Sequence, residues 1–184
     1  MNVKEYRAEP GYSYSSLKAY LKSPLHGAKQ TPFAETAAMR FGTGVDMAMK
    51  GDQASIVVSP YDDFRTKEAR EWKATNADKF VVSGSDAERI AACAASVSNH
   101  LAVREMKLQY MESDPPMFGS IDGIRIKGLP DWAFGGVIVD LKTTSGGVDA
   151  VSFAKTVDSF HYDLQAAVYT ELARQNGEEE TQFY

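Results

Sequence analysis

Residues 128–144 read Gly-Leu-Pro-Asp-Trp-Ala-Phe-Gly-Gly-Val-Ile-Val-Asp-Leu-Lys-Thr-Thr, and this stretch decides the fold. Paired glycines between apolar runs are typical of a hairpin, so we expect two strands joined by a Gly-Gly turn. The second strand, residues 137–142, is apolar until Asp140. Residues two apart in a strand share a face, so Asp140 and Lys142 should point the same way. The hairpin partner can bring Asp131 close to that face.

Two carboxylates and one ammonium at the end of an apolar strand predict a particular chemistry. Acidic oxygens hold a hard divalent cation such as Mg²⁺. A nearby lysine can orient or deprotonate a water and stabilise the charge that builds on a phosphate. The alternative is an exposed ion pair, the commoner meaning of an Asp and a Lys two apart on a strand. Because a mostly apolar strand indicates burial on both faces, the two charges at its end need a reason.

Composition restricts the class of protein. The 184 residues suffice for a single domain with its own core, and 43% hydrophobic with 24% charged residues is ordinary for a soluble globular protein. No apolar run approaches the roughly 20 residues of a membrane span, so no membrane partner is expected. The single cysteine, Cys93, excludes an internal disulfide and fits a reducing cytoplasm. The net charge of -5 argues against nonspecific coating of nucleic acid but not against a nuclease.

Asp46 is a further candidate ligand. It stands in the sequence Val-Asp-Met-Ala-Met, residues 45–49, which predicts a helix packed on the core. A carboxylate in such a helix needs a partner or a cation. An outward-facing Asp on an amphipathic helix is the alternative.

A final helix is expected over residues 162–175, where Gln165 and Tyr169 lie four apart and therefore on one face. Because a Gln on a packed face must find partners, its amide could serve a phosphate, a base edge or the catalytic lysine. A plain helix–strand hydrogen bond is the alternative.

The rest of the chain provides the remaining elements. We expect residues 1–12 to be irregular, a long helix over about residues 87–104, and a strand meander over residues 118–127 ahead of the hairpin. A short helix should span about residues 150–157. The chain finishes on Gln-Phe-Tyr, residues 182–184, as at the start of a strand, so we expect the sequence to be a C-terminally truncated fragment.

Together these motifs resemble the PD-(D/E)XK nuclease signature. Pro130-Asp131 followed by Asp140-Leu141-Lys142 matches its acidic core, and Gln165 with Tyr169 resembles the Gln-x-x-x-Tyr motif of the RecB-like branch. The wider chain is similar to the exodeoxyribonuclease VIII (RecE) nuclease domain family and its phage relatives. The matching blocks run in family order and are Ser-Pro-Leu-His (23–26), Phe-Gly-Thr-Gly-Val (41–45), Glu-Ser (112–113), Lys-Gly-Leu-Pro-Asp-Trp (127–132), Val-Asp-Leu-Lys-Thr-Thr (139–144) and Tyr-Asp-Leu-Gln-Ala-Ala (162–167).

The resemblance implies a restriction-endonuclease-like α/β core, a mixed central β-sheet flanked by helices, in one nuclease domain over residues 1–184. It implies Mg²⁺- or Mn²⁺-dependent hydrolysis of phosphodiester bonds in linear DNA, duplex above all, for recombination or repair in a phage or prophage. The implied site residues are metal ligands Asp131 and Asp140, water-orienting Lys142, auxiliary acid Glu112, and Gln165 and Tyr169 in support of the lysine or the DNA. The family usually has a histidine where Asp46 stands; a carboxylate binds Mg²⁺ as naturally, so we expect Asp46 to be a ligand as well.

The implied partners are DNA, a single-strand annealing protein and further copies of the chain in a homo-oligomer. A RecB-like nuclease of CRISPR adaptation or repair is a rival, but such relatives carry a cysteine cluster that one Cys93 cannot supply. The other rival is a catalytically impaired nuclease-fold module that binds DNA or protein.

Overall fold

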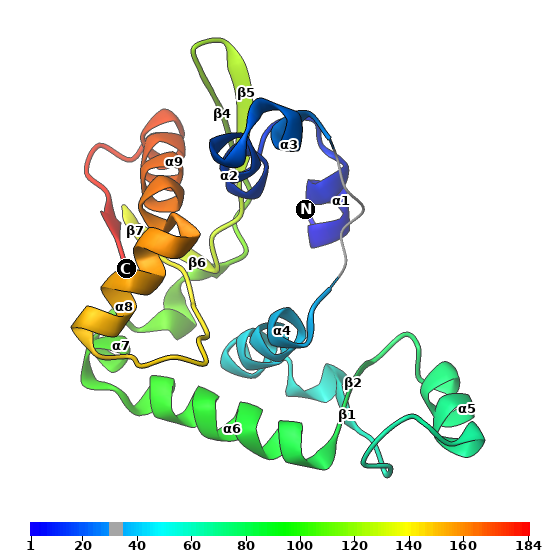
Figure 1. Cartoon of the computed structure of the whole chain (residues 1–184). Coiled ribbons are helices and arrows are strands. Elements are labelled where there is room, and N and C mark those ends of the chain that lie inside the picture. Colours follow the sequence, from blue (N-terminus) through cyan, green and yellow to red (C-terminus); the bar gives the residue numbers. More distant parts are fainter. Residues whose placement is uncertain (30–34) are drawn as a thin grey trace. The chain divides into compact units, whose positions relative to one another are not determined.

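The computed structural model describes residues 1–29 and 35–184, and the chain divides into two compact units. The first unit comprises Met1–Phe33 with Met111–Tyr184, and the second comprises Ala34–Tyr110. Figure 1 labels most of the elements of both units along the chain. Among the helices in the described ranges, none combines the length and the apolar character needed to cross a membrane.

The first unit is built on a four-stranded sheet of order β3-β6-β7-β8. The strands β3 (Glu112–Ser113), β6 (Trp132–Phe134) and β7 (Val137–Val139) pair antiparallel, and β8 (Gln182–Phe183) joins β7 in parallel, so the sheet is mixed as predicted. The predicted Gly-Gly turn connects β6 to β7, with φ of +54° at Gly135 and +79° at Gly136. Positive φ at both central residues is the two-residue turn that matches the twist of paired strands.

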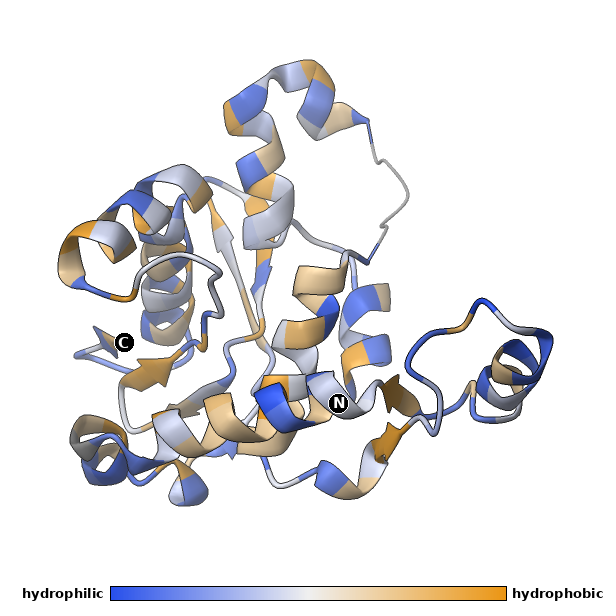
Figure 2. Ribbon diagram, turned by 60° about the horizontal axis from the view of Figure 1, so that its bottom comes forward, coloured by the Kyte–Doolittle hydropathy of each residue, from blue (hydrophilic) through white to orange (hydrophobic). Residues whose placement is uncertain are grey.

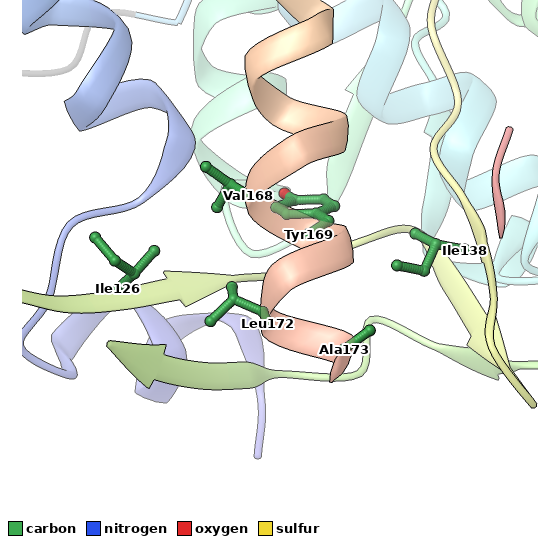
Figure 3. Close-up of a cluster of buried hydrophobic side chains, with 6 residues drawn as sticks. All are labelled: Ile126, Ile138, Val168, Tyr169, Leu172 and Ala173. Carbon is green, nitrogen blue, oxygen red and sulfur yellow. The ribbon is translucent and has the colours of Figure 1, made fainter. Parts of the chain in front are cut away.

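A second hairpin, β4 (Met117–Ile121) with β5 (Ile124–Gly128), confirms the predicted meander. Its turn is Asp122-Gly123, where both residues have positive φ. Helix α9 (Tyr162–Gln175), with the bounds predicted from the sequence, packs against the core side chains of both sheets. Figure 3 shows the resulting core, whose buried members are Ile126, Ile138, Val168, Tyr169, Leu172 and Ala173.

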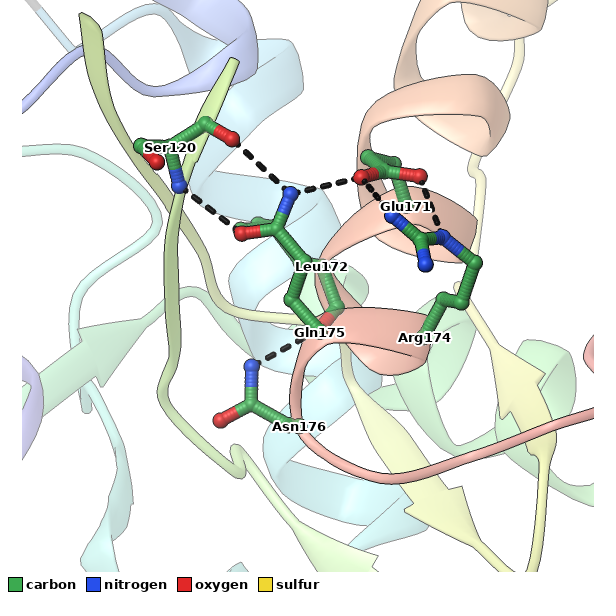
Figure 4. Close-up of polar contacts among 6 residues, drawn as sticks. All are labelled: Ser120, Glu171, Leu172, Arg174, Gln175 and Asn176. Carbon is green, nitrogen blue, oxygen red and sulfur yellow. Dashed lines mark hydrogen bonds and ion pairs between the residues drawn. The ribbon is translucent and has the colours of Figure 1, made fainter. Parts of the chain in front are cut away.

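Side chains at the C-terminal end of α9 bind the backbone of β4 and so hold the helix against that strand (Figure 4). Gln175 accepts a hydrogen bond from Ser120 N (2.9 Å) and donates one to Ser120 O (2.8 Å), as a neighbouring strand would. Asn176 Nδ2 donates to Phe118 O at 3.0 Å. These bonds complete backbone groups of β4 and fix the position of α9 along the hairpin.

The remaining helices of the first unit are α1 (Val3–Ala8), α2 (Tyr14–Lys22), α3 (Pro24–Ala28) and α8 (Ala150–Phe160). The prediction that residues 1–12 are irregular is wrong. Asn2 and Glu5 form a reciprocal capping box that starts α1. At the other end of α1, the buried ammonium of Lys127 in β5 donates to three backbone carbonyls at 2.6–3.3 Å. This long-range anchor has no signal in the local sequence.

The second unit contains α4 (Ala37–Met49), α5 (Lys67–Thr75), α6 (Gly84–Asn99), α7 (Leu101–Met106) and the parallel pair β1 (Ile56–Val58) and β2 (Phe80–Val82). In Figure 2 the two strands are orange and α5 is largely blue, so an apolar strand pair contrasts with a hydrophilic helix. The helix predicted over residues 87–104 is in fact two helices. His100 has φ −66° and ψ 133°, an extended conformation that ends α6 and begins α7.

Candidate active site

Asp140 and Lys142 lie at the C-terminal end of β7, in the middle of the sheet. The strand ends at Val139, so the two residues follow it rather than lie within it, a correction to the predicted range. Their side chains nevertheless meet as predicted, since Lys142 Nζ and Asp140 Oδ2 form a close ion pair. The Asp140 side chain is only 4% exposed and that of Lys142 23%. The alternative of an ordinary surface ion pair is therefore wrong for Asp140.

Asp131 lies directly before β6 and bridges the two ends of the hairpin. Its Oδ2 accepts a hydrogen bond from Leu141 N at 2.5 Å. Leu141 follows Asp140 in the chain, so this bond holds the backbone between Asp140 and Lys142. The predicted approach of Asp131 to the end of β7 is thus present in the structure.

Asp114 is an acid of this site that sequence reasoning missed. Its backbone N donates to Asp131 O at 3.1 Å, and carboxylate oxygens of the two residues lie within 4.8 Å of each other. Asp114 has φ +50° although it precedes a proline, a conformation that costs free energy and often marks a functional position. The Asp-Pro-Pro sequence indicated only a turn. Glu112, the predicted auxiliary acid, is exposed on β3, and its role stays a prediction.

Gln165 and Tyr169 project from one face of α9 toward this end of the sheet. Gln165 Nε2 donates to Asp140 Oδ1 at 3.0 Å, and Tyr169 OH donates to Leu129 O at 3.2 Å. Both side chains are buried. The sequence left several hydrogen-bond partners possible for Gln165. In the structure its amide bonds from the helix to the end of the sheet, and the acceptor is Asp140.

Asp140 contributes to the raised pKa of three tyrosines, and burial is the larger cause for each. The pKa of Tyr169 is raised far above its usual range, and the pKa of Tyr162 is raised as well. The pKa of Tyr14 is raised to about 12, first by burial. Since a nearby anion disfavours a phenolate, these residues are neutral hydroxyl donors at physiological pH. Lys142 Nζ lies 4.8 Å from the centre of the Tyr162 ring.

The donor set of the first unit fits a divalent cation. Asp114, Asp131 and Asp140 offer carboxylate oxygens, the ligands that Mg²⁺ and Mn²⁺ prefer. Like charges as close as those of Asp114 and Asp131 repel unless a cation or a proton joins them. Gln165 Oε1 is buried with no hydrogen-bond partner among the described residues, as expected where a water or hydrated ion completes a site.

Asp46 belongs to the second unit, where it lies in α4. Lys50, one turn later, contacts both of its carboxylate oxygens at 2.8 and 2.9 Å. The partner that a carboxylate in this helix was expected to need is therefore the residue that caps the C-terminal end of α4. The role of Asp46 as a metal ligand stays a prediction.

Comparisons with known proteins agree with this geometry. A family model described as "PDDEXK-like domain of unknown function (DUF3799)" matches residues 13–184. The structure is similar to the crystal structure of a "Putative exonuclease" from Eubacterium rectale, with a TM-score of 0.66 and 21% sequence identity over 100% of this chain and 71% of that one. No curated protein matches the sequence. The predicted superfamily and the restriction-endonuclease-like α/β class are confirmed.

Proposed function

Because this chain belongs to the PDDEXK-like family DUF3799, we propose that it is a divalent-metal-dependent deoxyribonuclease acting on linear DNA. The observation that carries the proposal is the junction of Asp131, Asp140 and Lys142 at one end of the β6–β7 hairpin. The Asp131 carboxylate accepts a hydrogen bond from the backbone amide of Leu141, the residue between Asp140 and Lys142. This bond holds both acids and the lysine at the same end of the hairpin. A purely structural ion pair does not require this convergence.

Each side chain has a distinct task in hydrolysis. Asp131 and Asp140, with Asp114 beside Asp131, would hold Mg²⁺ or Mn²⁺, which supplies Lewis-acid stabilisation of the charge on the phosphate. Lys142, as an ammonium on the face of Asp140, orients the attacking water and balances negative charge on the phosphate oxygens. Gln165 holds Asp140 by its amide and so fixes the direction of that carboxylate.

The finer assignment is exonucleolytic cleavage of linear duplex DNA in recombination or repair, in a phage or prophage context. It rests on the ordered motif blocks of the sequence. A single-strand annealing partner and a homo-oligomer are predictions that follow from the same resemblance, and a cytoplasmic location is a prediction from the single cysteine.

The test compares end-labelled linear duplex, linear single-stranded and closed circular DNA, each incubated with Mg²⁺, Mn²⁺ or a chelator. We expect cleavage of linear DNA only, and only with metal. Asp140→Asn and Lys142→Met should each lower the rate at least about 100-fold, because each removes a charge that acts on the transition state. Lys155→Met is the matched control, since Lys155 is exposed on α8 and outside the site.

Full activity in Asp140→Asn or Lys142→Met would refute the assignment of the site. DNA binding without cleavage by the unaltered protein would instead favour the impaired nuclease-fold module. Cleavage of closed circles would identify an endonuclease.

A further inference from the structure

A second lysine contacts the same group of aromatic rings as Lys142, from a different element. Lys18 lies on α2, and the positive charge of Lys142, after burial, lowers the pKa of Lys18. The motif blocks of the sequence do not include Lys18. Among the described residues no carboxylate forms an ion pair with it. Two ammonium groups on one group of rings repel each other, and an anion bound near both would relieve that repulsion.

Aromatic rings hold the Lys18 ammonium in place. Its Nζ lies 5.3 Å from the centre of the Tyr14 ring and 5.6 Å from that of the Phe160 ring. Tyr14 OH donates to Phe160 O, which joins α2 to the end of α8. Lys18 is thus positioned by packing rather than by an acid, which leaves its charge available to a ligand.

The same cluster offers a flat surface for a base. The rings of Phe160 and Tyr162 stack with 5.7 Å between their centres and 19° between their planes. Phe160 is 50% exposed, an unusual state for a phenylalanine next to a buried site. Lys142 lies over the Tyr162 ring and Lys18 over the Phe160 ring, so the two stacked rings connect the two lysines. Two acids act on this cluster. After burial, Asp140 raises the pKa of both Tyr14 and Tyr162, and the exposed Asp163 raises the pKa of Tyr14.

We infer that Lys18 and Phe160 form a nucleotide subsite next to the nuclease centre: Lys18 binds a phosphate neighbouring the scissile one, and the exposed Phe160 ring stacks on the adjoining base. A cation beside a partly exposed aromatic ring is the combination by which proteins hold a single nucleic-acid strand. The inference rests on the proposed nuclease function and adds a substrate contact to it.

The test measures binding of a labelled single-stranded oligonucleotide, without metal, over a range of salt concentrations. Lys18→Met should weaken binding about tenfold and make the negative slope of log K against log salt shallower by about 0.7, because one phosphate contact is lost. Lys22→Met, on the same helix but exposed, is the matched control and should keep the slope of the unaltered protein. Phe160→Leu should weaken binding about tenfold without a change of slope.

Cleavage in Mn²⁺ provides the second readout. Lys18→Met should raise KM with little change in kcat, and Lys18→Arg should restore most of the affinity, which a loss of packing alone would not produce. Thermal unfolding of each variant controls for stability.

The outcomes separate the two proposals. If the unaltered protein cleaves DNA and Lys18→Met binds with the slope of Lys22→Met, the subsite is refuted and the nuclease stands. If the unaltered protein binds but does not cleave, the nuclease is refuted and the salt slopes still decide the subsite. If it does not bind the oligonucleotide, the subsite is refuted as well.

Discussion

At the scale of single residues, the site distinguishes two neighbouring acids. Asp114 has its carboxylate within 4.8 Å of that of Asp131, whereas Glu112 is exposed on β3. We predict that Asp114→Asn lowers DNA cleavage about 10- to 100-fold, as loss of a ligand or its support does, and that Glu112→Gln changes it less than about threefold. Initial rates over a range of Mn²⁺ concentrations check this. The reverse order of the two variants would restore Glu112 as the auxiliary acid.

Replacing Gln165 by an apolar side chain should destabilise the charged form of Asp140. Its amide donates to Asp140, a carboxylate that is 4% exposed. A buried carboxylate that loses a donor is destabilised in its charged form. We therefore predict that Gln165 is a positioning residue, which would act on the proposed metal site through Asp140.

At the scale of elements, the bond from Tyr14 OH to Phe160 O joins α2 to α8. Burial, more than the nearby Asp140, raises the pKa of Tyr14 from 10.0 to about 12. A folded pKa above the unfolded one means that Tyr14 stabilises the protein fully below pH 10. This contribution is lost as the pH rises from about 10 to 12, since the unfolded chain ionises first.

Tyr14→Phe should therefore lower the free energy of unfolding at pH 7 by about 1 kcal/mol, the usual net value of one hydrogen bond. The difference between the unaltered protein and the variant should shrink at pH 11. Guanidinium unfolding at pH 7, 9 and 11 measures both. Tyr110→Phe is the control, because Tyr110 is 73% exposed. A difference that grows with pH would contradict the assigned sign.

At the scale of the whole molecule, metal binding should appear as stability. The clustered carboxylates of the first unit repel each other without a cation, and a ligand bound only by the folded state stabilises it. Mn²⁺ at about 100 times its dissociation constant adds about 2.7 kcal/mol, which corresponds to a rise of several degrees in Tm for a chain of this size. We expect this rise for the unaltered protein, its reversal by a chelator, and its loss in Asp131→Asn and Asp140→Asn.

The same titration decides the role of Asp46. If Asp46 is a ligand, Asp46→Asn should lose most of the rise in Tm. If Lys50 is its only functional partner, the variant should start from a lower Tm and show the full rise. Neither result depends on DNA cleavage, so the metal is tested separately from the activity.

Local sequence was sufficient wherever one backbone segment determined the outcome. The Gly135-Gly136 turn, the β4–β5 hairpin and α9 were predicted because turn glycines and helical periodicity act within a few residues. The pairing of Asp140 with Lys142 was predicted for the same reason, although the strand ends before them. α1 was missed although Asn2 and Glu5 supply a local capping box; its other anchor, Lys127, is more than 100 residues away.

The sequence by itself determined the family motifs, the two strands of the hairpin and the residue types that hold a divalent cation. Only the tertiary structure decided that Asp114 joins Asp131, that Gln165 binds Asp140, and that Lys18 and Lys142 contact one group of aromatic rings. The physical reason is range. Turn and helix preferences arise from neighbouring residues, whereas charge–charge and hydrogen-bonding contacts between distant residues exist only after packing has brought their elements together.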